Sequence, residues 1–115
     1  MITGQQEFDI INSIGELQRD IHCLAVSKDW WQETRNDGEQ MALMHSEISE
    51  CLEALRKGNP ESIKIPEFSM AEEELADAVI RILDHCESKG WNIAKAILAK
   101  HKFNHGRPPK HGKLF

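Results

Sequence analysis

Two carboxylate pairs, separated by a strong helix stop, constrain the fold of this chain more than any other feature. The first pair is Glu47 with Glu50, and the second is Glu74 with Asp77. Residues three apart lie on one face of a helix, so each pair would project from a single helical face. The Gly-Asn-Pro stop at residues 58–60 ends any helix between the pairs. The spacing predicts two helices joined by a loop and folded back as an antiparallel hairpin.

Such a hairpin would present four carboxylates to one point. Like charges confined to a dry site favour protonation, so four ionised carboxylates need a counter-charge. A hard divalent cation supplies it, and Mg²⁺, or Mn²⁺ in its place, prefers oxygen ligands of this kind. The competing interpretation is two solvated acidic helix faces. Because Glu47 and Glu50 border the apolar stripe of their helix rather than lying opposite it, the pattern favours a metal site.

Apolar residues recur at helical spacing in four segments, and strand-like alternation is absent from the sequence. We expect the first helix to end near Ser27, the second to cover residues 39–57, and capping boxes at Thr3 and Ser69. The stripe expected to line the buried seam on the second helix is Met41, Met44, Ile48, Cys51 and Leu55. The pattern predicts an all-α, four-helix-bundle-like single domain over residues 1–115, with a basic tail at 105–115. One small helix hairpin cannot cover all its apolar stripes, so we expect a homo-oligomer.

The charge distribution separates an acidic body from a basic end. The 115 residues include 14 Lys and Arg and 19 Asp and Glu, a formal net charge of −5, which argues against binding to nucleic-acid polymers. Five basic residues and no acid lie between Lys100 and Phe115, leaving 9 basic against 19 acidic residues elsewhere. This asymmetry suits a protein that binds both a metal ion and a polyanionic small molecule. The simpler alternative is that the basic end is only a solvated surface segment.

The three cysteines lack any CxxC spacing and lie within apolar patterns. Buried free thiols in a reducing cytosol are the simplest account of this distribution. The N-terminal residues lack a basic start followed by an apolar run, and no window reaches the roughly 20 apolar residues of a membrane span. We therefore expect a cytoplasmic protein without a membrane partner.

Two adjacent tryptophans, Trp30 and Trp31, follow the first helix. Adjacent side chains cannot easily point the same way, so one is expected in the core and the other is free for a flat ligand or a subunit contact. His22 lies beside the apolar stripe of the first helix, where a structural, hydrogen-bonded histidine is the simpler interpretation.

Together these motifs resemble the MazG-like all-α nucleoside triphosphate pyrophosphohydrolases. The family signature is E-E-x-x-E, a spacer and E-x-x-D, and the chain departs from it only in carrying Ser46 at the first position. This departure affects a supporting carboxylate more than the two pairs. The ending from Asn104 through Arg107 to the two prolines that follow is also similar to the family. The resemblance extends from Leu17 onward and implies a MazG-type fold. Whether the expected homo-oligomer is a dimer or tetramer stays open.

The resemblance further implies Mg²⁺-dependent cleavage of a nucleoside triphosphate between its α- and β-phosphates. The metal ligands it implies are Glu47, Glu50, Glu74 and Asp77. A carboxylate of Glu47 or Glu50 not fully used by the metal would take the proton of the attacking water.

The same resemblance implies substrate contacts outside the acidic cluster. Lys100 and Arg107 suit the phosphates, Arg107 through its bidentate fork, and Asn104 suits the sugar or base. His22 with Trp30 or Trp31 would form the base pocket.

Three alternatives share these sequence features. A dUTP- or dCTP-selective diphosphatase, or a phosphoribosyl-ATP pyrophosphohydrolase, would carry the same acidic helices. A catalytically silent helical dimerisation or metal-binding module would turn over no nucleotide. Base preference, sugar preference and the number of metal ions stay open at this point.

Overall fold

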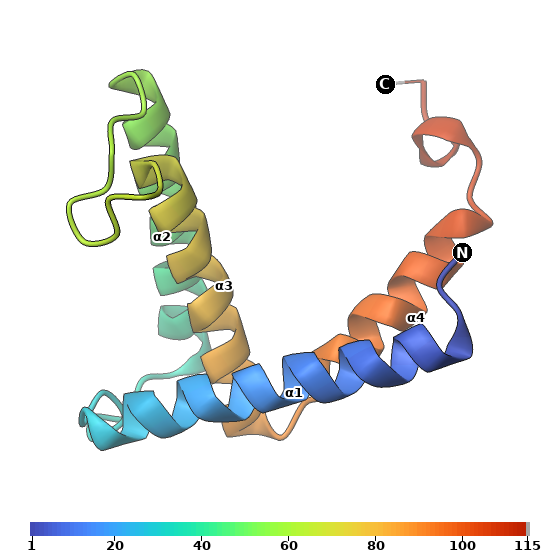
Figure 1. The fold of residues 1–115 in the computed structure, drawn as a ribbon, viewed down its shortest axis with the longest axis horizontal. Helices are drawn as coiled ribbons and strands as arrows, with labels where there is room; N and C mark the ends of the chain where they lie inside the picture. Colours follow the sequence, from blue (N-terminus) through green and yellow to red (C-terminus); the bar gives the residue numbers. More distant parts are fainter. Residues whose placement is uncertain (115) are drawn as a thin grey trace.

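The computed structural model describes residues 1–114 and contains four α-helices (Figure 1). These are α1 (Gly4–Ser27), α2 (Asp37–Arg56), α3 (Met70–Lys89) and α4 (Ile93–His105), followed by the 3₁₀ helix η1 (Pro109–Gly112). The described part of the chain has no strand, and the all-α prediction is confirmed. Every helix within residues 1–114 is too short or too polar to span a lipid bilayer. The last residue of the predicted basic tail lies outside the described residues.

Each of the first three helices begins where a polar side chain accepts a hydrogen bond from the first turn. Thr3 and Gln6 form a reciprocal capping box at the start of α1, and Ser69 and Glu72 form another at α3, both as predicted. The α2 helix begins two residues earlier than expected because Asn36 caps its first turn. A cap of this kind stabilises a helix by about 1 kcal/mol, so local sequence largely decides these boundaries.

The helices form two arms that meet at α1 (Figure 1). The α2 and α3 helices pack together as the predicted hairpin, and α1 lies across its base and packs on α3. The chain then reverses at Gly90, whose φ of 72° is the left-handed conformation that glycine adopts readily, and α4 packs on α1. Within one chain α4 lies away from the hairpin, so the four helices do not close into the predicted bundle.

The α2–α3 loop, residues 57–69, holds the two helices of the hairpin in register. Asn59 has a φ of 52°, a left-handed conformation that asparagine tolerates, and its side-chain oxygen accepts a hydrogen bond from the backbone N–H of Ala71. Ser62 is buried, and its hydroxyl accepts a hydrogen bond from the backbone N–H of Ile65. These bonds fix the start of α3 against the end of α2, and therefore which side chains face each other across the seam.

Small side chains fill the contacts between helices, while most large apolar side chains stay exposed. The buried apolar residues are Ala25, Cys51, Ala54, Ala71, Ala78, Leu83, Cys86 and Ala94. On α2 the predicted buried stripe is wrong for the single chain, since Ile48 and Leu55 are more than half exposed. The buried side chains of this helix are instead Glu47, Cys51 and Ala54. The physical reason is that close approach of α2 to α3 requires small residues at the contact.

The cysteine prediction is correct for two of the three thiols. Cys51 and Cys86 are free and buried, whereas Cys23 is free and exposed, so the expectation of burial is wrong for Cys23. The preceding residue, His22, faces α3, and one step along a helix rotates a side chain by about 100°, which turns Cys23 away from that contact.

Candidate functional site

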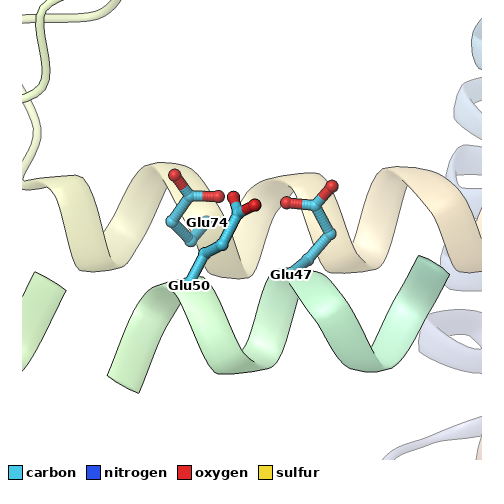
Figure 2. Close-up of side chains that lie close together, drawn as sticks. All are labelled: Glu47, Glu50 and Glu74. Carbon is cyan, nitrogen blue, oxygen red and sulfur yellow. The ribbon is translucent and has the colours of Figure 1, made fainter. Parts of the chain in front are cut away.

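The seam between α2 and α3 brings three carboxyl groups together (Figure 2). Glu47 and Glu50 project from successive turns of α2, and Glu74 projects from α3 beside them. One oxygen of each carboxyl group lies within 4.8 Å of an oxygen of each of the other two. Glu47 and Glu50 therefore share one face of α2, as their i, i+3 spacing predicts. The hairpin places this pair against Glu74 of α3.

Two of these carboxyl groups are buried, which is costly for ionisable side chains. Glu47 and Glu74 are each 7% exposed, and the Oε2 atom of Glu74 is enclosed with no hydrogen-bond donor among the described residues. Burial, and next the neighbouring carboxyl groups of Glu50 and Glu47, raise the pKa of Glu74 from 4.5 to about 7. A buried acceptor without a donor costs about 1–3 kcal/mol. A cation beside Glu74 Oε2 would offset both the repulsion and the missing hydrogen bond.

A second group of carboxyls adjoins the first and shares Glu74. It consists of Glu73, Glu74 and Asp77, with oxygens again within 4.8 Å of one another. Burial raises the pKa of Asp77, and the charge of Glu47 raises it further. The prediction of four carboxylates at one point is therefore corrected: two triplets share Glu74, and Asp77 belongs to the second.

Glu73 is a member of the site that sequence reasoning missed. Its position in the first turn of α3 suits the helix dipole, which is a sufficient reason for an acid there. The hydroxyl of the buried Ser62 donates a hydrogen bond to the Glu73 carboxylate, so the loop orients this side chain. Only the folded loop brings Ser62 to α3, and therefore the local sequence contains no signal for this contact.

Arg81 contributes the positive charge within the acidic seam. Its Nε atom donates to Glu47 Oε1 at 2.8 Å, from α3 across to α2. This ion pair offsets part of the charge of the buried Glu47 and holds its carboxylate in one orientation. Asp77 and Arg81 are four residues apart and therefore lie on one edge of α3. The pairing of Arg81 with Glu47 depends on the packing of α3 against α2.

One turn further along α3, Asp84 connects the hairpin to α1 and the loop after it. His22 Nδ1 lies 2.7 Å from Asp84 Oδ1, and Trp31 Nε1 donates to both carboxylate oxygens of Asp84 at 3.0 and 3.1 Å. The rings of His22 and Trp31 meet edge to face with centroids 5.2 Å apart. Trp30 is 61% exposed. Of the two tryptophans, Trp31 is therefore the one that packs inward, but it is half-buried beside a pocket rather than in the core as expected.

A pocket of about 380 Å³ opens beside this hydrogen-bonded group. Its walls come from the end of α1, the loop that follows, the start of α2 and the end of α3, and are formed by His22, Val26, Trp31, Arg35, Asp37, Gln40, His85, Ser88 and Lys89. Aromatic side chains and polar groups both line it, a combination that accommodates a flat, polar ligand. Arg35 and His85 are pocket residues that sequence reasoning did not identify.

His85 is the most unusual of the pocket residues. It is 3% exposed, and neither ring nitrogen has a hydrogen-bond partner among the described residues. Its ring packs edge to face on Trp91, with centroids 5.7 Å apart. The residue thus joins the base of the hairpin to the turn before α4.

The predicted phosphate-binding residues lie on the other arm. Lys100 and Asn104 lie on α4, and Arg107 lies in the turn after it. Figure 1 shows this segment running away from the α2–α3 hairpin. Lys100 Nζ lies 4.6 Å and Arg107 Cζ 5.9 Å from the centroid of the Phe103 ring. Within one chain the structure therefore does not bring these residues to the acidic cluster.

Comparison with known proteins leaves the site to be interpreted from its own chemistry. No family of known proteins, no curated protein and no solved structure matches the chain. The arrangement offers five carboxyl groups to hard cations, one guanidinium beside them, and a pocket with aromatic and polar walls along the same helix. Such a set of groups can bind divalent cations and an anionic ligand with a flat ring.

Proposed function

We propose that the protein is a Mg²⁺-dependent nucleoside triphosphate pyrophosphohydrolase that converts a (d)NTP to a (d)NMP and pyrophosphate. The observation that carries the proposal is Glu74, a buried carboxyl with an unpartnered oxygen, shared by two carboxylate triplets on facing helices. Acidic side chains whose only role is to keep a protein soluble lie in contact with water. A buried acidic cluster becomes favourable when Mg²⁺ joins it, and metal-bound triphosphate is the anion for which such sites are suited.

In the proposed reaction a cation would be held by one of the two triplets that share Glu74: Glu47 with Glu50 and Glu74, or Glu73 with Glu74 and Asp77. The ion would neutralise phosphate oxygens and lower the pKa of a bound water. The water oxygen attacks the α-phosphorus, the bond from that phosphorus to the bridging oxygen breaks, and pyrophosphate leaves.

Glu50 and Glu47 have different places in this proposed reaction. Glu50 is exposed at the rim of the seam, where a carboxylate can take the proton of the attacking water. Glu47 is held by Arg81 and is less free to move. We therefore assign the general base to Glu50 and an orienting, metal-binding role to Glu47.

The pocket at the base of the hairpin is the proposed site of the nucleobase. Asp84 lies on α3, the helix that also carries Asp77, and the step of seven residues between these two positions corresponds to about 10 Å at 1.5 Å per residue. That separation suits a nucleotide whose phosphates reach the metal while its base lies against Trp31. Asp84 accepts hydrogen bonds from Trp31 and contacts His22, and thereby holds the aromatic wall in place.

We further propose a homo-oligomer, a dimer or tetramer, in which one chain completes the site of another. The exposed apolar side chains of α2, α3 and α4 include Ile48, Leu52, Val79 and Phe103, each more than half exposed in the single chain. Large apolar side chains left exposed in this way favour association. Because Lys100 and Arg107 lie on the separate arm, a neighbouring chain is the simplest source of the phosphate-binding cations.

A nucleotide panel with product identification tests the reaction. Canonical and modified nucleoside triphosphates are incubated with Mg²⁺, and pyrophosphate and orthophosphate are measured separately. The proposal expects pyrophosphate and a monophosphate. Diphosphate with orthophosphate would exclude attack at the α-phosphorus, and absence of turnover with every nucleotide would favour a non-catalytic dimerisation module.

Mixing two inactive variants tests whether chains share a site. Glu50→Gln removes the base from the hairpin arm, and Arg107→Ala removes a cation from the other arm. If a dimer builds each site from both chains, random mixing of the two variants restores about a quarter of wild-type activity, because half the dimers contain one intact site of two. If each chain builds its own site, the mixture stays as inactive as its components.

A further inference from the structure

The pocket beside Trp31 has two carboxylates at its walls, and neighbouring side chains already engage both. Asp37 lines the pocket, and its Oδ1 atom lies 2.8 Å from Lys89 Nζ. Asp84 adjoins the wall, where Trp31 Nε1 donates to both of its oxygens and His22 Nδ1 lies 2.7 Å from Oδ1. Each acid therefore accepts from a donor of the protein, and neither is left unpaired for a ligand.

Donor groups on the same walls remain available. Arg35 is exposed on the pocket wall, and none of the described residues forms a salt bridge or side-chain hydrogen bond with its guanidinium. An ammonium group carries three protons, so Lys89 keeps two after its contact with Asp37. The amide of Gln40 on the same wall can donate or accept. The free hydrogen-bonding capacity of the pocket is therefore dominated by cationic N–H donors.

His22 supplies one acceptor to this donor-rich pocket. A carboxylate only accepts, so the Nδ1 atom that faces Asp84 carries the proton, and Nε2 of the neutral ring is an acceptor. Among the described residues none forms a hydrogen bond with that Nε2 atom. The other histidine of the wall, His85, has both ring nitrogens enclosed, so a ligand in the pocket meets its carbon atoms. The pocket thus combines two cationic donors with an imidazole acceptor.

We propose, on the basis of the proposed hydrolase function, that the substrate carries a pyrimidine base with two ring carbonyls, uracil or thymine. The pairing edge of these bases has two carbonyl oxygens on either side of one N–H group. Arg35 and Lys89 are the matching donors for the oxygens, and His22 Nε2 is the matching acceptor for the N–H. An enzyme that binds a base outside a duplex reads this same edge by hydrogen bonds and holds the ring against aromatic side chains, here Trp31.

Cytosine differs from uracil at the positions that this pocket would read. It carries an amino group in place of one carbonyl oxygen and an unprotonated ring nitrogen in place of the N–H. The amino group would face a donor and the ring nitrogen an acceptor, which leaves all four groups unpaired. A site built to hydrogen-bond one group discriminates against an analogue that lacks it, because its polar groups then lose their partners.

The test measures binding of nucleoside monophosphates to the full chain by isothermal titration calorimetry, with Mg²⁺ present. UMP, dUMP and dTMP are compared with CMP and dCMP, so that both sugars and the thymine methyl group are covered, and AMP and GMP are the purine comparisons. The tightest of the first three is expected to bind at least about tenfold more tightly than either cytosine nucleotide. Equal binding of uracil and cytosine, tighter binding of any other base, or no binding at millimolar concentration would overturn the proposal.

Two variants change the donors of the pocket in different ways. Arg35→Gln removes a cationic donor and is expected to weaken uracil binding at least about fivefold, with a smaller change for cytosine. Lys89→Met removes a donor and also frees the Asp37 carboxylate as an acceptor, so the preference for uracil is expected to fall below about threefold. Arg56→Gln is the matched control, because Arg56 is an exposed arginine at the opposite end of α2 from the pocket. Circular dichroism verifies the fold of each variant, and an unchanged base preference in both pocket variants would contradict the assignment of the donors.

Pyrophosphate release separates this inference from the proposed function. If the uracil preference and its dependence on Arg35 hold while no nucleoside triphosphate is hydrolysed, the pocket reads the base in a protein that is not a hydrolase. If triphosphates are hydrolysed without preference for uracil or thymine, the proposed reaction stands and the inference about the base is wrong.

Discussion

The two arms of the molecule treat polar and apolar side chains in opposite ways. In the α2–α3 hairpin the carboxyl groups of Glu47 and Glu74 are buried at 7% exposure. On α4 the ring of Phe103 is 62% exposed, and Lys100 and Arg107 lie against it. Burying an acid without a counter-charge and exposing a large apolar ring are both unfavourable. The comparison teaches where each arm is unfavourable. The hairpin holds more carboxyl groups than Arg81 can pair with, and α4 leaves a large apolar ring in contact with solvent.

The largest expected effect comes from neutralising one acid of the hairpin. Glu50→Gln should reduce turnover by more than about a hundredfold. Substitution of residues that only hydrogen-bond to metal ligands already lowers metal affinity or activity by about 10–100-fold. Helical content should remain, because glutamine and glutamate have similar helix propensities. Pyrophosphate release and far-ultraviolet circular dichroism measure the two quantities.

The matched control for that variant is Glu53→Gln. Glu53 lies one turn further along α2, exposed, with Lys57 Nζ 3.7 Å away, and it is outside both carboxylate triplets. Full activity in this variant and loss in Glu50→Gln would separate site chemistry from general surface charge. Equal activity in both variants would remove the hairpin from the proposed mechanism.

The next effect concerns the uncovered apolar surface. Leu55→Glu places a charge on the exposed stripe of α2, and burial of a leucine contributes about 1.5–3 kcal/mol. If a second chain covers the stripe, the variant should dissociate at least tenfold more readily, as measured by light scattering at micromolar concentration. Ala42→Glu, on the outward face of the same helix, should leave the assembly unchanged. A monomeric wild type would contradict the proposed oligomer directly.

The free energy of unfolding of the metal-free protein should depend on pH through Glu74. The pKa of Glu74 is about 7 in the folded protein and near 4.5 in the unfolded chain, so the folded state binds more protons between these pH values. The free energy of unfolding should therefore fall as pH rises from 4.5 to 7, by an amount of the order of 2 kcal/mol after solvent screening. Glu74→Gln should flatten this dependence in denaturant titrations with a chelator, at constant protein concentration. Parallel pH profiles for the two proteins would show that Glu74 does not titrate in this range.

The smallest expected effect is the loss of Mg²⁺-induced stabilisation in single-site variants. A ligand at 100 times its dissociation constant raises the free energy of unfolding by about 2.7 kcal/mol, and weaker binding reduces that gain. Thermal melts at pH 8 with and without Mg²⁺ should show a smaller shift for Glu50→Gln and for Asp77→Asn than for wild type. A reduced shift in only one of these variants would show which carboxylate triplet holds the ion. An unreduced shift in both would place the bound Mg²⁺ elsewhere.

Much of the local structure follows from short-range chemistry. Thr3 and Ser69 mark helix starts because their side chains accept hydrogen bonds from unpaired backbone N–H groups of the first turn. Gly90 marks a helix end because its left-handed conformation lets its own N–H bond to carbonyl groups of the last turn. The i, i+3 spacing likewise places Glu47 and Glu50 on one face without reference to any other helix. These properties depend on neighbouring residues only, and they were predictable for that reason.

Helical periodicity, however, did not reveal which face of each helix would be buried. An apolar stripe predicts burial, yet the closest contact of α2 and α3 selected small residues and acids, and left Ile48 and Leu55 exposed. Which side chains lie between two packed helices depends on both surfaces at once. The predicted burial of this stripe is therefore wrong for the single chain.

The sequence by itself determined an all-α chain, its helix boundaries to within about two residues, and the acidic pairs that define the candidate site. Only the tertiary structure decided that Glu73 joins through Ser62, that Arg81 pairs with Glu47, and that Lys100 and Arg107 lie on the other arm. The physical reason is distance along the chain: helix caps and face spacing involve residues three or four apart. Contacts between elements depend on how loops and packed surfaces orient whole helices in space.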